Sequence, residues 1–131
     1  MIKCIILTHG DLGSALKRTL EGIMGKQEGL SIISNSGLGR EELLSALTGK
    51  LTQERDKEGV IIFVDMFGTS CWQTAKKVVA EAGSHGNKNA VITGVNLPML
   101  VKFFSHRQTL PLEQLVPLVK QEGEKGIRTE T

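Results

Sequence analysis

The chain alternates between short apolar runs and longer segments with helical spacing. The runs have the length of strands and are rich in β-branched residues; they cover residues 2–8, 30–35, 60–65 and 89–95. Those at 2–8 and 60–65 are apolar almost throughout instead of alternating with polar residues. Such continuous runs are typical of strands buried on both faces of a parallel sheet, so we expect these two strands at its centre.

The segments between the runs carry apolar residues on one helical face, with polar residues on the other, which predicts amphipathic helices. They cover residues 12–24, 40–55 and 70–83. After the fourth run the pattern predicts two more helices, over residues 97–104 and 110–123. Pro117 should kink or shorten the last one, because proline has no backbone N–H to donate within a helix.

This alternation favours an α/β fold of three layers, with helices covering both faces of a mainly parallel sheet. For a chain of 131 residues, the natural strand order is the flavodoxin-like 2-1-3-4. A brief last strand around residues 126–129 would follow the final helix. We expect a single domain over residues 1–131.

Composition and charge narrow the classes of function. Hydrophobic residues make up 40% of the chain and charged residues 23%, as in an ordinary globular domain. The net charge of +2 is spread along the chain and aromatic residues are only 4%, which argues against nucleic-acid binding. No apolar run reaches the length that spans a bilayer. Cys4 and Cys71 have no CxxC spacing, and no secretory leader precedes them, so we expect a cytoplasmic protein.

A histidine and a carboxylate follow the two central strands. His9 comes after the strand at 2–8, and Asp65 ends the run at 60–65. Ligands of open α/β sheets bind beyond the carboxyl ends of the strands where the winding reverses, here between these two strands. We therefore expect Asp65 to accept a hydrogen bond from Nδ1 of His9, which leaves the lone pair of Nε2 free as a nucleophile or base.

Glycines and hydroxyl groups beside this pair predict a small anion site. Gly10 opens the first helix, and Gly68, Thr69 and Ser70 precede the third, where unpaired N–H groups welcome a phosphate. Neither a Walker loop nor a GxGxxG motif occurs, so a nucleotide is not expected. With no metal-ligand cluster and no other nucleophile nearby, the economical chemistry is phosphoryl transfer through His9, without a cofactor.

Plainer interpretations exist for each of these residues. A lone histidine at a strand end is more often a capped surface residue, and Asp65 could cap the turn that follows it. Ser70 is expected to be the N-cap of the third helix, whatever else it does. A lone Cys71 is a poor redox or nucleophile candidate.

Three segments in this order and spacing resemble the IIA component of the mannose-type sugar phosphotransferase system (PTS). They are THG after the first strand, GVIIFVDMFGTS at the third and VITGVNLPML at the fourth. The resemblance implies that His9 accepts phosphate from the phosphocarrier HPr and passes it to a IIB protein for sugar uptake. It also implies that Asp65 orients His9 and that Ser70 and nearby amides hold the phosphate oxygens.

The family resemblance further implies partners and an assembly. Members are typically homodimers that exchange a short C-terminal strand, for which KGIRTET is the candidate, and they meet the membrane only indirectly, through a IIC/IID permease. The rim on which partners dock would include Met24, Phe67, Asn96, Pro98 and Met99.

This chain departs from the family pattern FGGSPFNAA, having FGTSCWQTA, with Thr69 for glycine and Cys71 for proline. These changes leave the choice of IIB partner open. They also leave open a regulatory module that HPr phosphorylates but that feeds no permease. A third interpretation, similarity to the phosphotransfer subunit of dihydroxyacetone kinase, shares the fold and the histidine but fits these segments less well.

Overall fold

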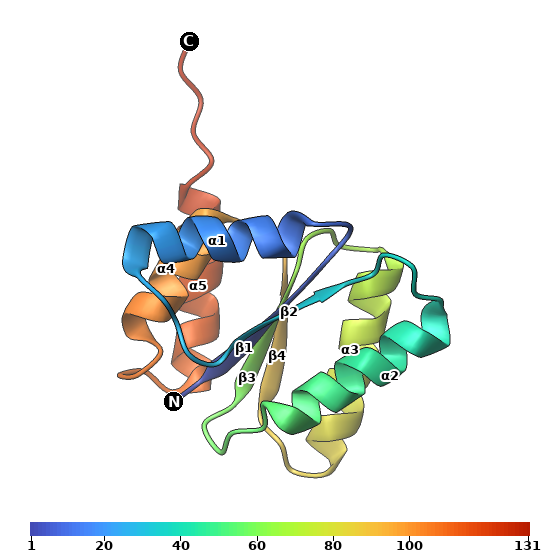
Figure 1. The fold of residues 1–131 in the computed structure, drawn as a ribbon. Helices are drawn as coiled ribbons and strands as arrows, with labels where there is room; N and C mark the ends of the chain where they lie inside the picture. The colour runs from blue at the N-terminus through green and yellow to red at the C-terminus, as the bar shows by residue number, and fades with distance from the viewer.

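Four parallel strands form the central sheet, in the order β2-β1-β3-β4 (Figure 1). The computed structural model describes all residues from 1 to 131. Its strands are β1 (Lys3–Thr8), β2 (Leu30–Ser34), β3 (Val60–Val64) and β4 (Asn89–Thr93). The predicted strand order is therefore confirmed, with β1 and β3 at the centre.

Five helices cover the two faces of the sheet and complete the three layers (Figure 1). They are α1 (Leu12–Met24), α2 (Arg40–Gln53), α3 (Ser70–Ser84), α4 (Leu97–His106) and α5 (Leu112–Lys125). Helices α1, α4 and α5 lie on one face, and α2 and α3 lie on the other. The α/β class inferred from the alternation of elements is confirmed.

The central strands are apolar almost throughout because each of their faces supplies a separate core. In β1, Cys4 and Ile6 face the cluster under α1, α4 and α5, whereas Ile5 and Leu7 face the cluster under α2 and α3. Successive side chains of a strand point to opposite faces, so the middle of a strand covered on both sides is apolar and polar residues are left to its ends, as Lys3 and Thr8 are in β1.

Register brings three strand ends to one edge of the sheet. Leu7 of β1 pairs with Val64 of β3, and Thr8 pairs with Ser34 of β2. The residues that follow these strands therefore emerge side by side, with those after β1 in the middle. This edge is where the crossovers to α1 and α3 leave on opposite faces, as the switch point requires.

Two expectations about the C-terminal part need revision. Helix α5 continues through Pro117 to Lys125. The carbonyl of Glu113 loses its partner, but Glu113 and Pro117 both lie on the exposed side, where water can replace the missing bond. Leu115 and Val119, buried on the other side, hold the helix against the core.

The last residues form no strand within this chain. Residues 127–131 have no regular structure, and the segment leaves the body of the molecule beyond α5 (Figure 1). Ile127 is 76% exposed, so its apolar side chain finds no partner in its own chain. The expected strand around residues 126–129 is therefore absent here, and its exchange between two subunits stays a prediction.

Candidate functional site

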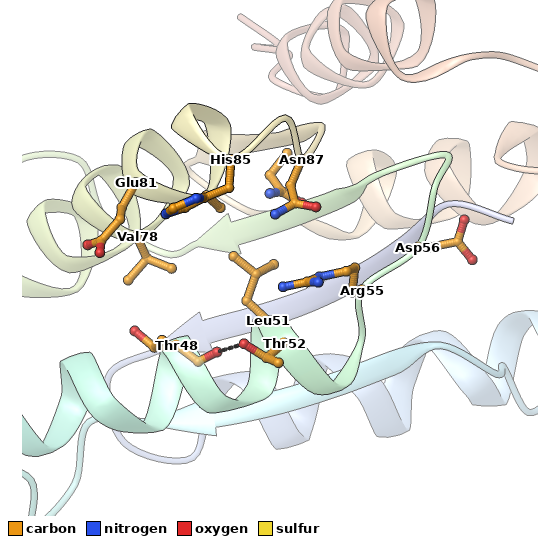
Figure 2. A pocket seen from close by; sticks show the side chains of 11 residues that line it. Thr48, Leu51, Thr52, Arg55, Asp56, Val78, Glu81, His85 and Asn87 are labelled. Atoms are coloured by element: carbon orange, nitrogen blue, oxygen red, sulfur yellow. Dashed lines mark hydrogen bonds between the residues drawn. The ribbon is translucent and has the colours of Figure 1, made fainter.

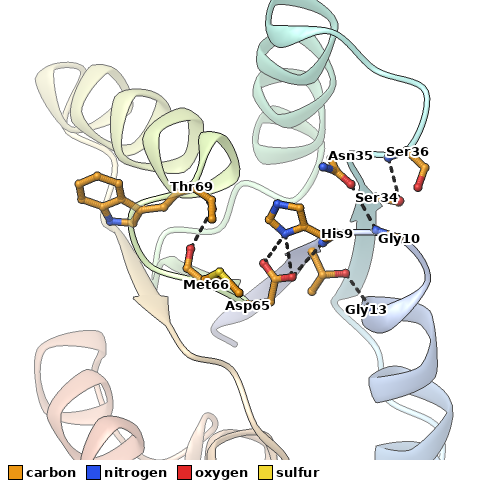
Figure 3. A network of polar contacts seen from close by, with 11 residues as sticks. His9, Gly10, Gly13, Ser34, Asn35, Ser36, Asp65, Met66 and Thr69 are labelled. Atoms are coloured by element: carbon orange, nitrogen blue, oxygen red, sulfur yellow. Dashed lines mark hydrogen bonds and ion pairs between the residues drawn. The ribbon is translucent and has the colours of Figure 1, made fainter.

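His9 and Asp65 meet at the carboxyl edge of the sheet, as their positions after β1 and β3 predict (Figure 3). Nδ1 of His9 lies 2.9 Å from Oδ2 and 3.1 Å from Oδ1 of Asp65. The backbone N–H of His9 also donates to Oδ2, at 3.0 Å. One carboxylate therefore fixes both the backbone and the ring of the histidine.

This contact decides which ring nitrogen is reactive. An ionised carboxylate only accepts hydrogen bonds, so Nδ1 of His9 must carry the proton and Nε2 keeps its lone pair. The side chain of His9 is 43% exposed, whereas that of Asp65 is 11% exposed. The nucleophilic nitrogen thus belongs to an accessible ring, while the group that orients the ring is shielded.

The environment keeps Asp65 ionised. Burial of the carboxylate raises its pKa, but hydrogen bonds from the backbone N–H and the ring of His9, with the attraction of a protonated imidazole, outweigh that effect. The pKa of Asp65 is therefore lower than that of an ordinary aspartate. A permanent negative charge faces the ring on the side away from Nε2.

A second side chain, Asn35, fixes the residue after the histidine. Its Oδ1 accepts a hydrogen bond from the N–H of Gly10, at 3.2 Å, and Gly10 has φ +55°, a conformation that favours glycine (Figure 3). The Gly10 N–H, expected to face a phosphate, is therefore already engaged. Asn35 was not identified from the sequence, although a polar residue directly after the second strand, next to the first in the predicted order, is a usable signal.

The turn before α3 corrects one expectation. Thr69, not Ser70, is the N-cap: its backbone is extended, and its Oγ1 accepts from Trp72 N at 3.4 Å and donates to Met66 O at 2.8 Å. Both roles of the Thr69 hydroxyl are thus used within the turn (Figure 3). Ser70 is the first residue of α3, is exposed and forms no side-chain hydrogen bond in the protein. Its hydroxyl remains available for an anion, as do first-turn N–H groups of the helix.

Gly68 lies in the same turn, between Asp65 and α3, and a Cβ at this position would meet no atom within 4 Å. The space in front of the turn is therefore open. Cys71 points the other way and is fully buried. Burial, and secondarily the charge of Asp65, raises the pKa of its thiol, so it remains protonated and does not compete with His9.

A hollow beside Ser70 separates the first turns of α2 and α3. Its volume is about 370 Å³, and Arg40 and Lys77 line it together with Glu41. Two helix N-termini open toward this region, and each carries partial positive charge from its unpaired N–H groups. The α3 side of this hollow is consequently favourable to a negatively charged group, whereas Glu41 and Glu42 in the first turn of α2 oppose one on the other side.

The residues expected on the docking rim differ in their exposure and in their distance along the fold from the site. Phe67 is 69% exposed in the turn after Asp65, next to the 61% exposed Met66, which the sequence did not single out. Met24 is the last residue of α1, a helix that begins beside the site and runs away from it. Its side chain packs against the core beneath α1.

The other three predicted rim residues lie at the start of α4. Asn96 is the N-cap of α4, and its Oδ1 accepts from Met99 N at 3.1 Å. Pro98 is partly exposed and lies against Gly126. Met99 is only 5% exposed, so its side chain belongs to the core and not to the surface.

A second cavity lies at the opposite end of the sheet, between the C-terminal turns of α2 and α3 (Figure 2). It has a volume of about 170 Å³, and Arg55, His85 and Asn87 line it. It contains no histidine–carboxylate hydrogen bond, in contrast to the open site around His9. Nowhere do three or more His, Cys, Asp and Glu side chains gather to hold a metal ion, and no helix has the length and apolar composition to cross a membrane.

Comparisons with known proteins identify the family of this chain. Residues 3–120 match the family model EIIA-man, described as the PTS system fructose IIA component. The mannose-specific EIIAB component of the Escherichia coli (strain K12) PTS is 31% identical over 129 residues, which cover 97% of this chain and 39% of that relative. The fructose-specific EIIA component of Bacillus subtilis (strain 168) is 29% identical over 129 residues, 98% of this chain and 86% of the relative.

A solved structure of a IIA component has the same fold as this chain. The crystal structure of phosphotransferase system component EIIA from Streptococcus agalactiae superposes with a TM-score of 0.89 at 26% identity, covering 98% of this chain and 97% of the other. This chain spans well under half the length of the E. coli relative but most of the B. subtilis one. With the family match extending over residues 3–120, the chain belongs to the mannose/fructose-type IIA family of the sugar phosphotransferase system, a family of phosphotransferase components.

Proposed function

We propose that the protein is a phosphoryl carrier in which Nε2 of His9 accepts a phosphoryl group from phosphorylated HPr and donates it to a IIB protein or domain for sugar uptake. The observation that carries this proposal is the pairing of Nδ1 of His9 with Asp65 at 2.9 Å, which directs the lone pair to Nε2 on an exposed ring. Family membership supplies the class of reaction.

The transfer step balances without a metal, a cofactor or a proton transfer. The lone pair of Nε2 attacks the phosphorus of the donor phosphohistidine, whose other ring nitrogen carries a proton. A new N–P bond forms as the donor N–P bond breaks, and the donor leaves as neutral imidazole. His9 keeps its proton on Nδ1 and gains positive charge, which the Asp65 carboxylate stabilises. The Ser70 hydroxyl and the adjacent N–H groups of α3 receive the phosphoryl oxygens, while Gly68 and Thr69 shape the turn that presents them.

Docking of both partners fits the apolar surroundings of the site. Four exposed large apolar side chains belong to the loops and helix start at this edge of the sheet: Leu12, Leu38, Met66 and Phe67. Where exposed apolar residues form one contiguous patch, that patch marks a protein interaction site. HPr and the IIB component would contact them in turn, and Asn96 and Pro98 would contribute at the outer border.

A homodimer belongs to the same proposal. The segment from residue 126 to residue 131, which finds no place in its own sheet, would add a strand to the sheet of a second copy. Contact with the membrane would be indirect, through a IIC/IID permease. Sedimentation of the full chain and of a chain ending at Lys125 tests the assembly, since only the former should be dimeric.

The deciding experiment for the carrier function is phosphorylation by radiolabelled phospho-HPr at neutral pH, which keeps acid-labile phosphoramidates intact. The wild type should take up label, and His9→Ala should take up none. His85→Ala is the matched control, because His85 is exposed at the far cavity and should leave labelling unchanged. Label that persists in His9→Ala would refute the assignment.

A chase with a IIB protein then separates a carrier from a regulatory module. A carrier should lose its label to IIB within the mixing time of the assay. Label retained on His9 in the presence of candidate IIB proteins from the same cell would instead favour regulation by phosphorylation state.

A further inference from the structure

The loop after β1 is held from both flanking strands. On the β3 side, the N–H of His9 donates to Asp65 at 3.0 Å; on the β2 side, the N–H of Gly10 donates to Asn35 at 3.2 Å. The backbone of Asn35 is itself anchored, because its N–H donates to Thr8 O at 3.1 Å. Asn35 is thus fixed relative to His9 through two independent hydrogen bonds.

The Gly10 contact settles the orientation of the Asn35 amide. A backbone N–H can only donate, so the atom that it contacts must be Oδ1, and Nδ2 must occupy the other side of the amide. Nδ2 forms no hydrogen bond within the protein, and Asn35 is half-buried. In Figure 3 this nitrogen is on the side of the amide that faces the His9 imidazole.

We propose that Nδ2 of Asn35 donates a hydrogen bond to the phosphoryl group on His9, while Oδ1 keeps the Gly10 N–H. This inference rests on the proposed function and adds a third side to its anion site. Ser70 and the N-terminus of α3 would contact the phosphoryl oxygens from the β3 side, and Asn35 would contact them from the β2 side. The oxygens of a phosphoryl dianion accept short, charge-assisted hydrogen bonds from such donors.

The choice of asparagine has a physical reason. Aspartate would have the same shape and would accept the Gly10 N–H equally well. It would, however, replace the Nδ2 donor by a carboxylate oxygen that faces the phosphoryl group, and the two negative charges would repel each other. A purely structural role for residue 35 would require only the acceptor.

Direct observation of the Asn35 side chain tests the proposal. Isotope-labelled protein would be phosphorylated chemically with phosphoramidate, which needs no HPr, and the side-chain NH₂ signals would be followed by NMR. One Asn35 NH proton should shift downfield when His9 is phosphorylated, and the shift should be absent in His9→Ala. Phosphorylated His9 without a change in the Asn35 signal would overturn the inference.

Two variants give an independent measurement, the rate of His9 phosphorylation by phosphoramidate. Asn35→Ala should slow it about tenfold, the effect of losing one charge-assisted hydrogen bond, and Asn35→Asp should slow it at least as much although the Gly10 amide signal stays in place. Asn87→Asp, at the far cavity, is the matched control and should react at the wild-type rate.

A wild-type rate in Asn35→Asp would show that only the acceptor matters and would overturn the inference. Failure of HPr to label His9 is a different result: it would contradict the proposed carrier function, while the chemical phosphorylation would still measure the role of Asn35.

Discussion

Replacing Asp65 by asparagine removes the charge that orients His9 while preserving the shape of the side chain. The amide oxygen of asparagine can still accept the hydrogen bond from the backbone N–H of His9, which Oδ2 accepts at 3.0 Å in the wild type. That same oxygen position also lies 2.9 Å from Nδ1 of His9, while the amide nitrogen takes the place of Oδ1, 3.1 Å from Nδ1. An amide nitrogen donates and cannot accept, so Nδ1 of His9 keeps one neutral acceptor in place of two carboxylate oxygens, and the negative charge that would stabilise the phosphorylated ring is lost.

The magnitude follows from the charge that is lost. Opposite charges about 4 Å apart attract by about 4 kcal/mol at an effective dielectric constant of about 20. The His9 ring is 43% exposed, so solvent screens part of this attraction. A net loss of about 2–3 kcal/mol in the transition state corresponds to transfer that is slower by about 30- to 150-fold.

The assay is single-turnover transfer from radiolabelled phospho-HPr, stopped by rapid quenching, with thermal unfolding measured on the same samples. Asp56→Asn is a matched control, because Asp56 is also a carboxylate of lowered pKa, held chiefly by the backbone N–H of Glu58, at the opposite end of the sheet. Its variant should lose some stability but transfer normally. Transfer within threefold of the wild type in folded Asp65→Asn would refute the role given to Asp65.

The lowered pKa of Asp65 predicts the direction in which stability changes with pH. Because the folded-state pKa of Asp65 is lowered, its contribution to stability is fully present above the unfolded value of about 3.9 and is lost as the pH falls through the folded pKa. The part of the difference in free energy of unfolding between wild type and Asp65→Asn that comes from protonation of Asp65 should therefore be constant above about pH 5 and shrink only in acid.

Two further predictions concern the support of the site. Gly13→Ala should destabilise the protein by about 1–3 kcal/mol in urea unfolding, because a Cβ there would lie 3.0 Å from Thr8 Oγ1, which now accepts the Gly13 N–H. Gly22→Ala in the same helix, where a Cβ meets nothing within 4 Å, should instead stabilise by about 0.5–1 kcal/mol, and equal effects of the two would contradict this packing. Cys4 and Cys71 are fully buried with raised pKa values, so neither thiol should react with a thiol reagent until the chain unfolds; rapid reaction of the native protein would show that the core opens readily.

The sequence was sufficient to predict the strands whose local pattern reflects their burial. The continuous apolar runs around Ile5 and Ile62 identify strands covered on both faces, since alternation is lost only when both sides are buried. That places β1 and β3 at the centre and brings the residues after them together. The convergence of His9 and Asp65 therefore follows from the chain itself, once both are seen to end central strands.

Side-chain hydrogen bonds at the same edge did not follow from the sequence. Ser70 and Thr69 are adjacent hydroxyl residues, and which of them caps α3 depends on where the backbone turns from extended to helical, which neighbouring contacts decide. The continuation of α5 through Pro117 depends likewise on which side of the helix faces water. Met99 looks like a surface residue in a loop motif, yet close packing against Gly123 buries it.

The sequence alone thus determined the layers, the central strands and the meeting of His9 with Asp65, because those depend on periodicity and on which residues end buried strands. Only the tertiary structure decided that Asn35 holds Gly10, that the Thr69 hydroxyl is used up and that the Ser70 hydroxyl is left free. Those features depend on the register of three strands and on the geometry of the turns, because a hydrogen bond forms only within a narrow range of distances. Residues distant in the chain set the register and the turn geometry together.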